Sequence, residues 1–561
     1  MWSLASRRPS IPPAFYRGVA GVSAKQTPPS KKYDAIIVGG GHNGLTAAAY
    51  LAKAGKSVCV LERRHVLGGA AITEEIVPGF KFSRASYLLS LFRPQVIKDL
   101  DLKRHGLRYH IKDPTSFTPV RGTTQSLLLG SDMKANQAEI GKFSAADAIA
   151  YPKYEAMMES IVHSLEPLMD QEPLQLEKDL KFSGMSKLYN LWKTVRPMGA
   201  KNALEFYELM TAPISKVMDR WFEGDVLKAT LATDGVIGFM AGPHAPGTGY
   251  VLLHHVLGGL DGRTGAWAFV YGGMGAVSQA IANAAKEAGA ELLVDAEIEK
   301  ILVDDNVAKG VKLVGGGEIH ADVVLSNATP KVTFLDLLEK KTLPTDFYNA
   351  VRAIDYNSPV TKINVALKEL PNFTALPNQG SQPMPHHQTT VHLNCETIDI
   401  LHGAYVDAQN GRWSQMPAIE MTIPSSVDKT IAPDGCHVAL LFTQYCPYTL
   451  KDGTWDEATK NAYAKHVFDH IDAYAPNFSS SVVGFEVLTP PDLEKTFNLT
   501  GGNIFHGSMS LDQLYWTRPV KNFANYRTPI KGLYLCGSGA HPGGGVTGAP
   551  GRLAALAVLN D

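Results

Sequence analysis

Three glycines and one glutamate near the start of the chain have the spacing of a dinucleotide site. Gly39 permits a tight turn, Gly41 lets the backbone approach a pyrophosphate, and Gly44 allows the next helix to lie close to the strand before it. Glu62 ends the following apolar run, where its carboxylate can accept hydrogen bonds from both ribose hydroxyl groups. A carboxylate at this position favours a free 2′-OH over a 2′-phosphate, so these residues predict dinucleotide binding.

The elements that must position these residues are a strand, a helix and a second strand. Residues 35–38 form a continuous apolar run, which is typical of a parallel strand buried on both faces. The alanine-rich residues 45–51 are predicted to form the helix, and residues 57–61 are predicted to form the second strand. His42 and Asn43 stand where the helix begins, so its amide groups and the positive end of its dipole face the phosphates.

Three further segments are rich in glycine. Gly68 and Gly69 follow Glu62, residues 271–328 read as a helix, a hairpin and a return strand, and residues 532–548 read as a buried strand and a glycine-rich loop that leads into a last helix. Together with the first motif, these segments resemble the FAD-containing amine oxidase and phytoene desaturase superfamily. Within it the sequence is most similar to the phytoene desaturase and carotenoid isomerase branch, from about residue 33 to the C-terminus.

The resemblance implies that the dinucleotide is FAD, bound without a covalent link. The Ile298 backbone is then expected to meet adenine, and the last helix points its N-terminus at the flavin pyrimidine ring, where the amides of Val546 and Thr547 favour the reduced, anionic flavin. Besides Gly39, Gly41, His42, Asn43, Gly44 and Glu62, the expected FAD contacts are Arg63, Gly68, Gly69, Ala70, Ile298, Gly537, Ser538, Val546 and Thr547.

These elements predict an α/β fold with a discontinuous, Rossmann-like FAD-binding domain of the glutathione reductase type. Apolar positions recur at helical spacing over 145–168 and 187–221, which predicts a mainly helical insertion. A mixed strand and helix pattern follows, and it favours an α+β substrate-binding domain. The expected division is FAD-binding domain 33–110, 265–330 and 500–561, helical insertion 111–264, and substrate-binding domain 331–499.

No acid/base dyad or nucleophile motif stands out, so the catalytic residues are unknown, with two candidates. His541 lies in the loop expected beside the flavin, and Lys362 could approach flavin N5 through water, although a charge on the solvated face of an alternating strand explains Lys362 equally well. His506 and Tyr515 are candidates for the cavity wall. The histidines lack the carboxylate partners and spacing of a metal site, so no metal is expected.

Composition excludes several classes of protein. A net charge of −1 over 561 residues gives no electrostatic reason to expect nucleic acid as a partner. No apolar run is long enough to span a bilayer, which leaves at most peripheral membrane contact. The five cysteines contain no C-x-x-C pair, so neither a zinc site nor a dithiol redox centre is expected, and their low number favours a reducing compartment.

The first 32 residues are basic, contain serines and lack acidic residues. This composition predicts a transit peptide for the mitochondrial matrix, with a disordered tail as the alternative.

The expected function is FAD-dependent oxidation, because flavin itself carries the difficult chemical step. By resemblance, the substrate is a small hydrophobic molecule that is desaturated or isomerised by hydride transfer to flavin N5. Two alternatives stay open: oxidation of an amine, and a non-catalytic FAD-binding scaffold in mitochondria that acts through protein partners.

Overall fold

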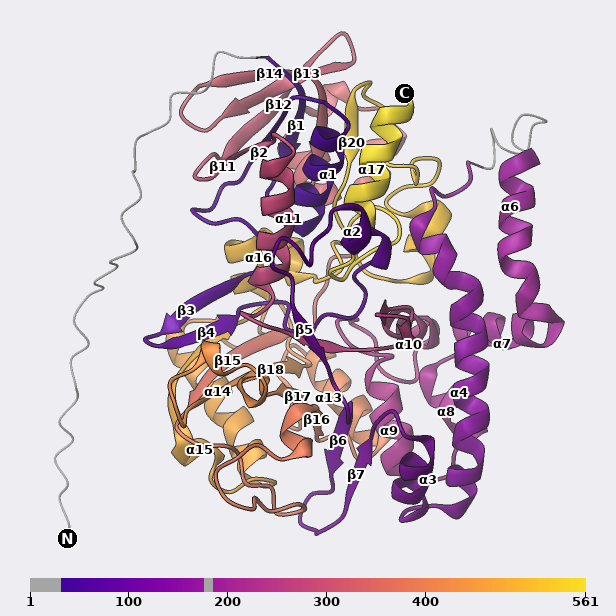
Figure 1. Ribbon diagram of the computed structural model, residues 1–561, viewed down its shortest axis with the longest axis vertical. Coiled ribbons are helices and arrows are strands. Elements are labelled where there is room, and N and C mark those ends of the chain that lie inside the picture. Colours follow the sequence, from indigo (N-terminus) through magenta and orange to yellow (C-terminus); the bar gives the residue numbers. More distant parts are fainter. Residues whose placement is uncertain (1–31, 176–184) are drawn as a thin grey trace, which may run out of the picture.

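The computed structural model describes residues 32–175 and 185–561. The segment predicted to be a transit peptide lies outside these ranges except for Lys32, which forms an ion pair with Asp322. In the described ranges the chain forms two large sheets, and Figure 1 shows them one above the other, with a layer of helices along one side.

The first sheet carries the predicted nucleotide-binding strands. Its strand order is β11-β2-β1-β14-β13-β12, with β20 paired to β14. The pairs β1–β2, β1–β14, β2–β11 and β14–β20 are parallel, whereas β12, β13 and the start of β14 form an antiparallel hairpin sheet. The strands are β1 (Tyr33–Val38), β2 (Val58–Leu61), β11 (Glu291–Leu293), β12 (Ile298–Asp304), β13 (Val307–Leu313), β14 (Glu318–Ser326) and β20 (Leu533–Leu535). This topology confirms the predicted Rossmann-like fold, with strands drawn from distant parts of the chain.

Three helices lie close to one another at this sheet. α1 (His42–Lys53) packs against α11 (Gly275–Glu287) and α17 (Ala549–Asn560). The approach of α17 is close because Gly551 has no side chain: a Cβ atom there would lie 2.0 Å from the Asn43 carbonyl oxygen. The predicted strand, glycine turn and helix, and the predicted last helix, are therefore all confirmed.

The second sheet has the order β19-β15-β18-β17-β16-β6-β7 and is antiparallel except for the β16–β6 pair. Its strands are β6 (Ser116–Pro119), β7 (Ser126–Leu129), β15 (Thr361–Leu367), β16 (Thr390–Leu393), β17 (Ala418–Thr422), β18 (His437–Gln444) and β19 (Val482–Leu488). On one face Ile363, Met421 and Leu441 form a core with residues of α14 (Glu457–Asp472). Since side chains alternate along a strand, their neighbours in sequence lie on the opposite face.

The layer of helices comes mainly from residues between the two parts of the nucleotide-binding fold. It includes α3 (Met133–Gly141), α4 (Ala145–Leu165), α9 (Asp225–Thr233) and α10 (Thr248–Val256). The helical stretch predicted over 187–221 consists of α6 (Met185–Val195), α7 (Gly199–Thr211) and α8 (Ile214–Trp221). Pro197 and Pro213 stand at the two interruptions, because proline has no amide hydrogen for a helix interior.

The expected division at residue 110 does not coincide with a boundary between sheets. It falls inside β5 (Tyr109–Ile111), which pairs with β10 (Ala268–Val270). Beyond it, β6 pairs with β16 of the second sheet, so the segment predicted as a helical insertion also supplies two strands to that sheet. The sequence around β6 does not show this role, because the strand that pairs with it, β16, lies far along the chain. None of the helices in the described parts of the chain combines the length and apolar character needed to cross a bilayer.

Candidate active site

The first glycine loop has no room for side chains. A Cβ atom at Gly44 would lie 2.2 Å from the Gly39 carbonyl oxygen, so a larger residue would displace the loop itself. At Gly41 the nearest atom to an added Cβ is Nδ2 of Asn327, at 2.8 Å. Asn327 directly follows β14 and fills the space beside the loop, a contact that the sequence did not reveal. The turn therefore presents bare backbone, as pyrophosphate binding requires.

The second glycine pair lies directly against the first loop. The Gly68 amide donates to the Gly40 carbonyl oxygen at 2.9 Å, and Gly41 and Gly68 form a β-bridge. A Cβ atom at Gly69 would lie 3.1 Å from the Gly41 Cα atom. Two segments predicted to contact one ligand are thus in contact with each other.

Glu62 follows β2 and is only 6% exposed. Its Oε2 atom accepts a hydrogen bond from the Gly40 amide at 2.8 Å, and its Oε1 atom accepts one from the Arg64 amide at 2.9 Å. Because a carboxylate can accept about four hydrogen bonds, the group keeps capacity for ribose hydroxyls. The Arg63 guanidinium donates instead to the carbonyls of Lys495 and Thr496, at the end of α16 (Pro490–Phe497).

These residues fit FAD. Beside the glycine loops, the His42 Nε2 and Asn43 Oδ1 atoms are buried without a hydrogen-bond partner among the described residues. Buried polar atoms in native proteins nearly always have partners, so both atoms require a ligand or water at the start of α1. Gly39, Gly41, Gly44, Gly68 and Glu62 would hold the diphosphate and ribose of the bound dinucleotide. Ile298 begins β12, in the hairpin sheet next to β14, and is half-buried.

A cavity of about 780 Å³ begins at these loops and reaches the second sheet. Four of the residues predicted to contact FAD line this cavity: His42, Ala70, Ser538 and Val546. Its other walls come from α4, α9, α10 and the strands of the second sheet, and they include the candidate His506. Burial, and then the charge of Arg518, lower the pKa of His506 to about 3, which keeps it neutral.

Lys362 also lines this cavity, so its alternative placement on a solvated face is wrong. The strand does alternate as predicted, but its polar face turns to the cavity and Lys362 is only 1% exposed. Its Nζ atom donates to Asn364 Oδ1 at 2.6 Å and lies 5.5 Å from the centre of the Tyr87 ring. Burial lowers the pKa of Lys362 to about 7, although Glu486 opposes the shift.

His541 is positioned differently from what its loop suggested. Its Nε2 atom donates to the Leu168 carbonyl oxygen at 2.9 Å, and its ring packs edge-on against Tyr515. Burial lowers the pKa of His541 to about 4, so the imidazole is neutral. Neither His541 nor Tyr515 is among the described residues that line the cavity. The role of His541 therefore stays a prediction, and Lys362 is the catalytic candidate that lines the cavity.

The closing loop after β20 is held by its own contacts. Gly537 leads into Ser538, whose Oγ atom accepts from Asn43 Nδ2 at 3.2 Å. The Thr547 amide donates to the Gly545 carbonyl oxygen at 3.1 Å, so it is engaged within the loop and does not point freely at a ligand. Gly545 and Val546 of this loop line the cavity. The expected contact of the Val546 and Thr547 amides with the flavin stays a prediction.

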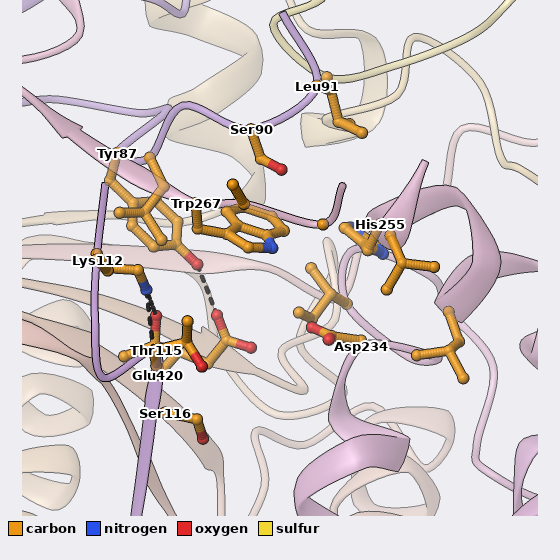
Figure 2. A pocket seen from close by; sticks show the side chains of 18 of the residues that line it. Tyr87, Ser90, Leu91, Lys112, Thr115, Ser116, Asp234, His255, Trp267 and Glu420 are labelled. Atoms are coloured by element: carbon orange, nitrogen blue, oxygen red, sulfur yellow. Dashed lines mark hydrogen bonds between the residues drawn. The ribbon is translucent and has the colours of Figure 1, made fainter. Parts of the chain in front are cut away.

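Sequence reasoning missed Arg518, which organises this loop. Its side chain is 1% exposed, and its guanidinium donates to the carbonyls of Phe505, Gly507, Ser508, Gln513 and Ser538. Sequence reasoning also missed a cluster of four polar side chains on the cavity wall: Tyr87, Lys112, Asp234 and Glu420 (Figure 2). Both sets converge from distant segments, and no local spacing marks them.

Comparison with known proteins agrees with this geometry. Residues 96–411 match the family described as flavin containing amine oxidoreductase, and residues 37–101 match an NAD(P)-binding Rossmann-like domain. The chain belongs to the flavin-containing amine oxidoreductase family. As a member of this family it is a flavin oxidoreductase, and the FAD cofactor predicted from the sequence is confirmed.

Three relatives show the breadth of the family. The chain is 54% identical to the mouse (Mus musculus) pyridine nucleotide-disulfide oxidoreductase domain-containing protein 2, over 98% of this chain and 96% of the relative. It is 23% identical to a lycopene-forming phytoene desaturase of Pseudescherichia vulneris, over 93% of this chain and 98% of the relative. The structure of cyclohexylamine oxidase from Brevibacterium oxydans has the same fold, with a TM-score of 0.55 and 15% identity over 94% of this chain and 99% of that one.

The name of the first relative mentions disulfide chemistry. Such chemistry needs a pair of neighbouring, reactive cysteines beside the flavin. In this chain all five cysteines are free. Cys59 lies in β2, and Cys395, Cys436, Cys446 and Cys536 lie outside the helices and strands. Burial raises the pKa of the Cys395, Cys446 and Cys536 thiols, which disfavours the reactive thiolate. In residues 32–175 and 185–561, His, Cys, Asp and Glu side chains form no group of three or more arranged as a metal site.

Replacing Glu62 tests the ribose contact in this flavoprotein. Glu62→Ala is expected to raise the dissociation constant of FAD about tenfold, or about 1.4 kcal/mol, because water replaces part of the lost hydrogen bonding. The constant is measured by titrating apoprotein with FAD and following the quenching of flavin fluorescence. The exposed Glu369→Ala serves as control, and equal affinities for both variants would remove Glu62 from the site.

Proposed function

We propose that this flavin oxidoreductase desaturates or isomerises a small hydrophobic molecule. The observation that carries the proposal is a cavity that touches both the FAD loops and the second sheet. Its volume of about 780 Å³ lies within the range of small-molecule sites, about 300–1,000 Å³. A compound bound there would lie beside the cofactor, with one part against the second sheet.

The residues of the chain bind and enclose the substrate. Apolar side chains of α4 and α10, among them Met158, Val162, Leu252 and Val256, line much of the wall and favour an apolar molecule. They also exclude water from the bound substrate. Bound FAD supplies the hydride acceptor. Lys362, with its lowered pKa, can hold or release a proton near neutral pH at its Nζ atom.

Anaerobic reduction of the flavin tests this function. The purified holoprotein is mixed with hydrophobic alkenes, polyenes, alcohols and amines, and the flavin absorbance near its visible maximum is followed. We expect bleaching by a hydrophobic compound that can lose two hydrogens, one of them as hydride to the flavin. Isomerisation leaves the oxidation state of the flavin unchanged, so an isomerised substrate is detected by analysis of the products. Bleaching by amines alone would replace the proposal with amine oxidation, and a flavin that neither substrates nor dithionite can reduce would favour a scaffold role.

We also propose that the protein acts in the mitochondrial matrix, on the basis of the basic, acid-free first 32 residues. A fluorescent reporter fused to residues 1–32 is expected to enter mitochondria. The chain lacking these residues is expected to bind FAD and to stay in the cytosol. Unchanged mitochondrial location of the truncated chain would contradict this proposal.

A further inference from the structure

The second sheet presents a row of side chains to the cavity. The proposed reaction assigns a role to only one of them, Lys362. In the strand register His392 lies opposite Glu420, Glu420 opposite Phe442, and Phe442 opposite Lys362. Directly opposed residues project to the same face of a sheet, and all four line the cavity. The His392 and Glu420 end lies next to β6, in a part of the cavity distinct from the FAD loops.

Glu420 is the central polar group at this end. Its side chain is 6% exposed, and its Oε2 atom accepts a hydrogen bond from the Tyr87 hydroxyl at 2.7 Å, as Figure 2 shows. Its Oε1 atom is buried and has no partner among the described residues. The His392 Nδ1 and Ser116 Oγ atoms, which also line the cavity, are buried and unpartnered in the same sense. Three buried polar atoms without partners at this end of the cavity indicate a ligand atom that can both donate and accept hydrogen bonds.

The charges around Glu420 oppose each other. Burial raises the pKa of Glu420 to about 7, Asp234 adds to the shift, and the Tyr87 hydrogen bond and Lys112 oppose it. Burial lowers the pKa of Lys112 to about 7, against the attraction of Glu420 and Asp234. Lys112 donates to Thr390 Oγ1 and to the Thr115 carbonyl oxygen. Near neutral pH both groups are close to their pKa values, so a ligand of either charge lacks a fixed counter-charge that nothing opposes.

We infer that this end of the cavity binds a hydroxyl group of the substrate, which donates to Glu420 Oε1. The inference rests on the proposed function and narrows it to a hydrophobic alcohol whose apolar body extends toward the FAD loops. A hydroxyl donates one hydrogen bond and accepts others, so it matches Glu420 Oε1 together with Ser116 Oγ. An ammonium group would be attracted by Glu420 and Asp234 but repelled by Lys112, and a carboxylate would meet the reverse, whereas an uncharged hydroxyl needs no counter-charge.

Four probes with the same chain length test the inference: 1-octanol, n-octylamine, octanoate and octane. Each is titrated into the FAD-loaded protein at one neutral pH, and its dissociation constant is obtained from the change in the flavin spectrum and, independently of turnover, by calorimetry. We expect 1-octanol to bind at least tenfold more tightly than each of the other three. Tightest binding of octylamine or octanoate, or equal binding of octanol and octane, would overturn the inference.

Two variants and a control locate the effect. Glu420→Leu is expected to remove the preference for octanol while octane binds as before, and Tyr87→Phe, which frees the carboxylate from its fixed position, is expected to reduce the preference about threefold. Glu369→Leu changes an exposed carboxylate that does not line the cavity and is expected to keep the preference. A wild-type preference that survives Glu420→Leu would overturn the assignment. An intact octanol preference together with hydrophobic compounds that are neither oxidised nor isomerised would instead count against the proposed function alone.

Discussion

Gly41→Val protein is expected to purify without FAD. A Cβ atom at position 41 would already lie 2.8 Å from Asn327 Nδ2, and the two methyl groups of valine add bulk where the pyrophosphate must approach the backbone. We expect FAD binding to weaken by at least about 100-fold, or about 2.7 kcal/mol. The ratio of flavin to protein absorbance in the purified variant measures the loss.

The control must separate loss of the ligand from loss of the fold. Gly403, in α13 (Ile398–Gln409), has open space around an added Cβ atom, so Gly403→Ala should retain full FAD content. Far-ultraviolet circular dichroism should show intact secondary structure for both variants. Normal FAD content in Gly41→Val would place the nucleotide away from this loop.

Arg518→Leu is expected to have the largest effect on stability. The guanidinium donates to five carbonyl groups of residues 505–538, and leucine leaves them buried without a donor. At about 1–3 kcal/mol for each unsatisfied group, and with some carbonyls regaining water, we expect a loss of at least about 3 kcal/mol. Because one of these carbonyls belongs to Ser538, FAD content should fall as well.

Denaturant unfolding, followed by tryptophan fluorescence and by flavin release, measures this loss. Arg518→Lys keeps the charge but supplies fewer donors, so its stability should lie between those of the wild type and the leucine variant. Arg412→Leu replaces an exposed arginine and should change stability little. An Arg518→Leu protein as stable as the Arg412→Leu protein would show that water replaces the guanidinium.

The nucleotide half of the site could be predicted from the sequence because its physics is local. A tight turn, a bare backbone and a carboxylate after the next strand all lie within residues 39–62, so spacing alone describes them. The cavity half could not be predicted. Tyr87, Lys112, Asp234 and Glu420 come from four separate segments, and only the pairing of the strands and the packing of α9 bring them together.

Lys362 and His541 show where local reasoning stops. The alternation around Lys362 correctly predicted a strand with two unlike faces, but alternation does not say whether the polar face meets water or a cavity. For His541 the glycine-rich loop was correctly placed at the end of β20. The direction of its imidazole depends on the Leu168 carbonyl of the helical layer, which no neighbour in sequence specifies.

The strand pairing also constrains when the protein can fold during synthesis. β6 has its partner β16 in residues made much later, and β14 receives β20 only when the chain is nearly complete. Since domains fold as units as they leave the ribosome, a nascent chain must hold one edge of β6 open until β16 emerges, and one edge of β14 open until its last segment emerges. Products that terminate before β20 would expose such edges, and they are therefore candidates for aggregation and chaperone capture.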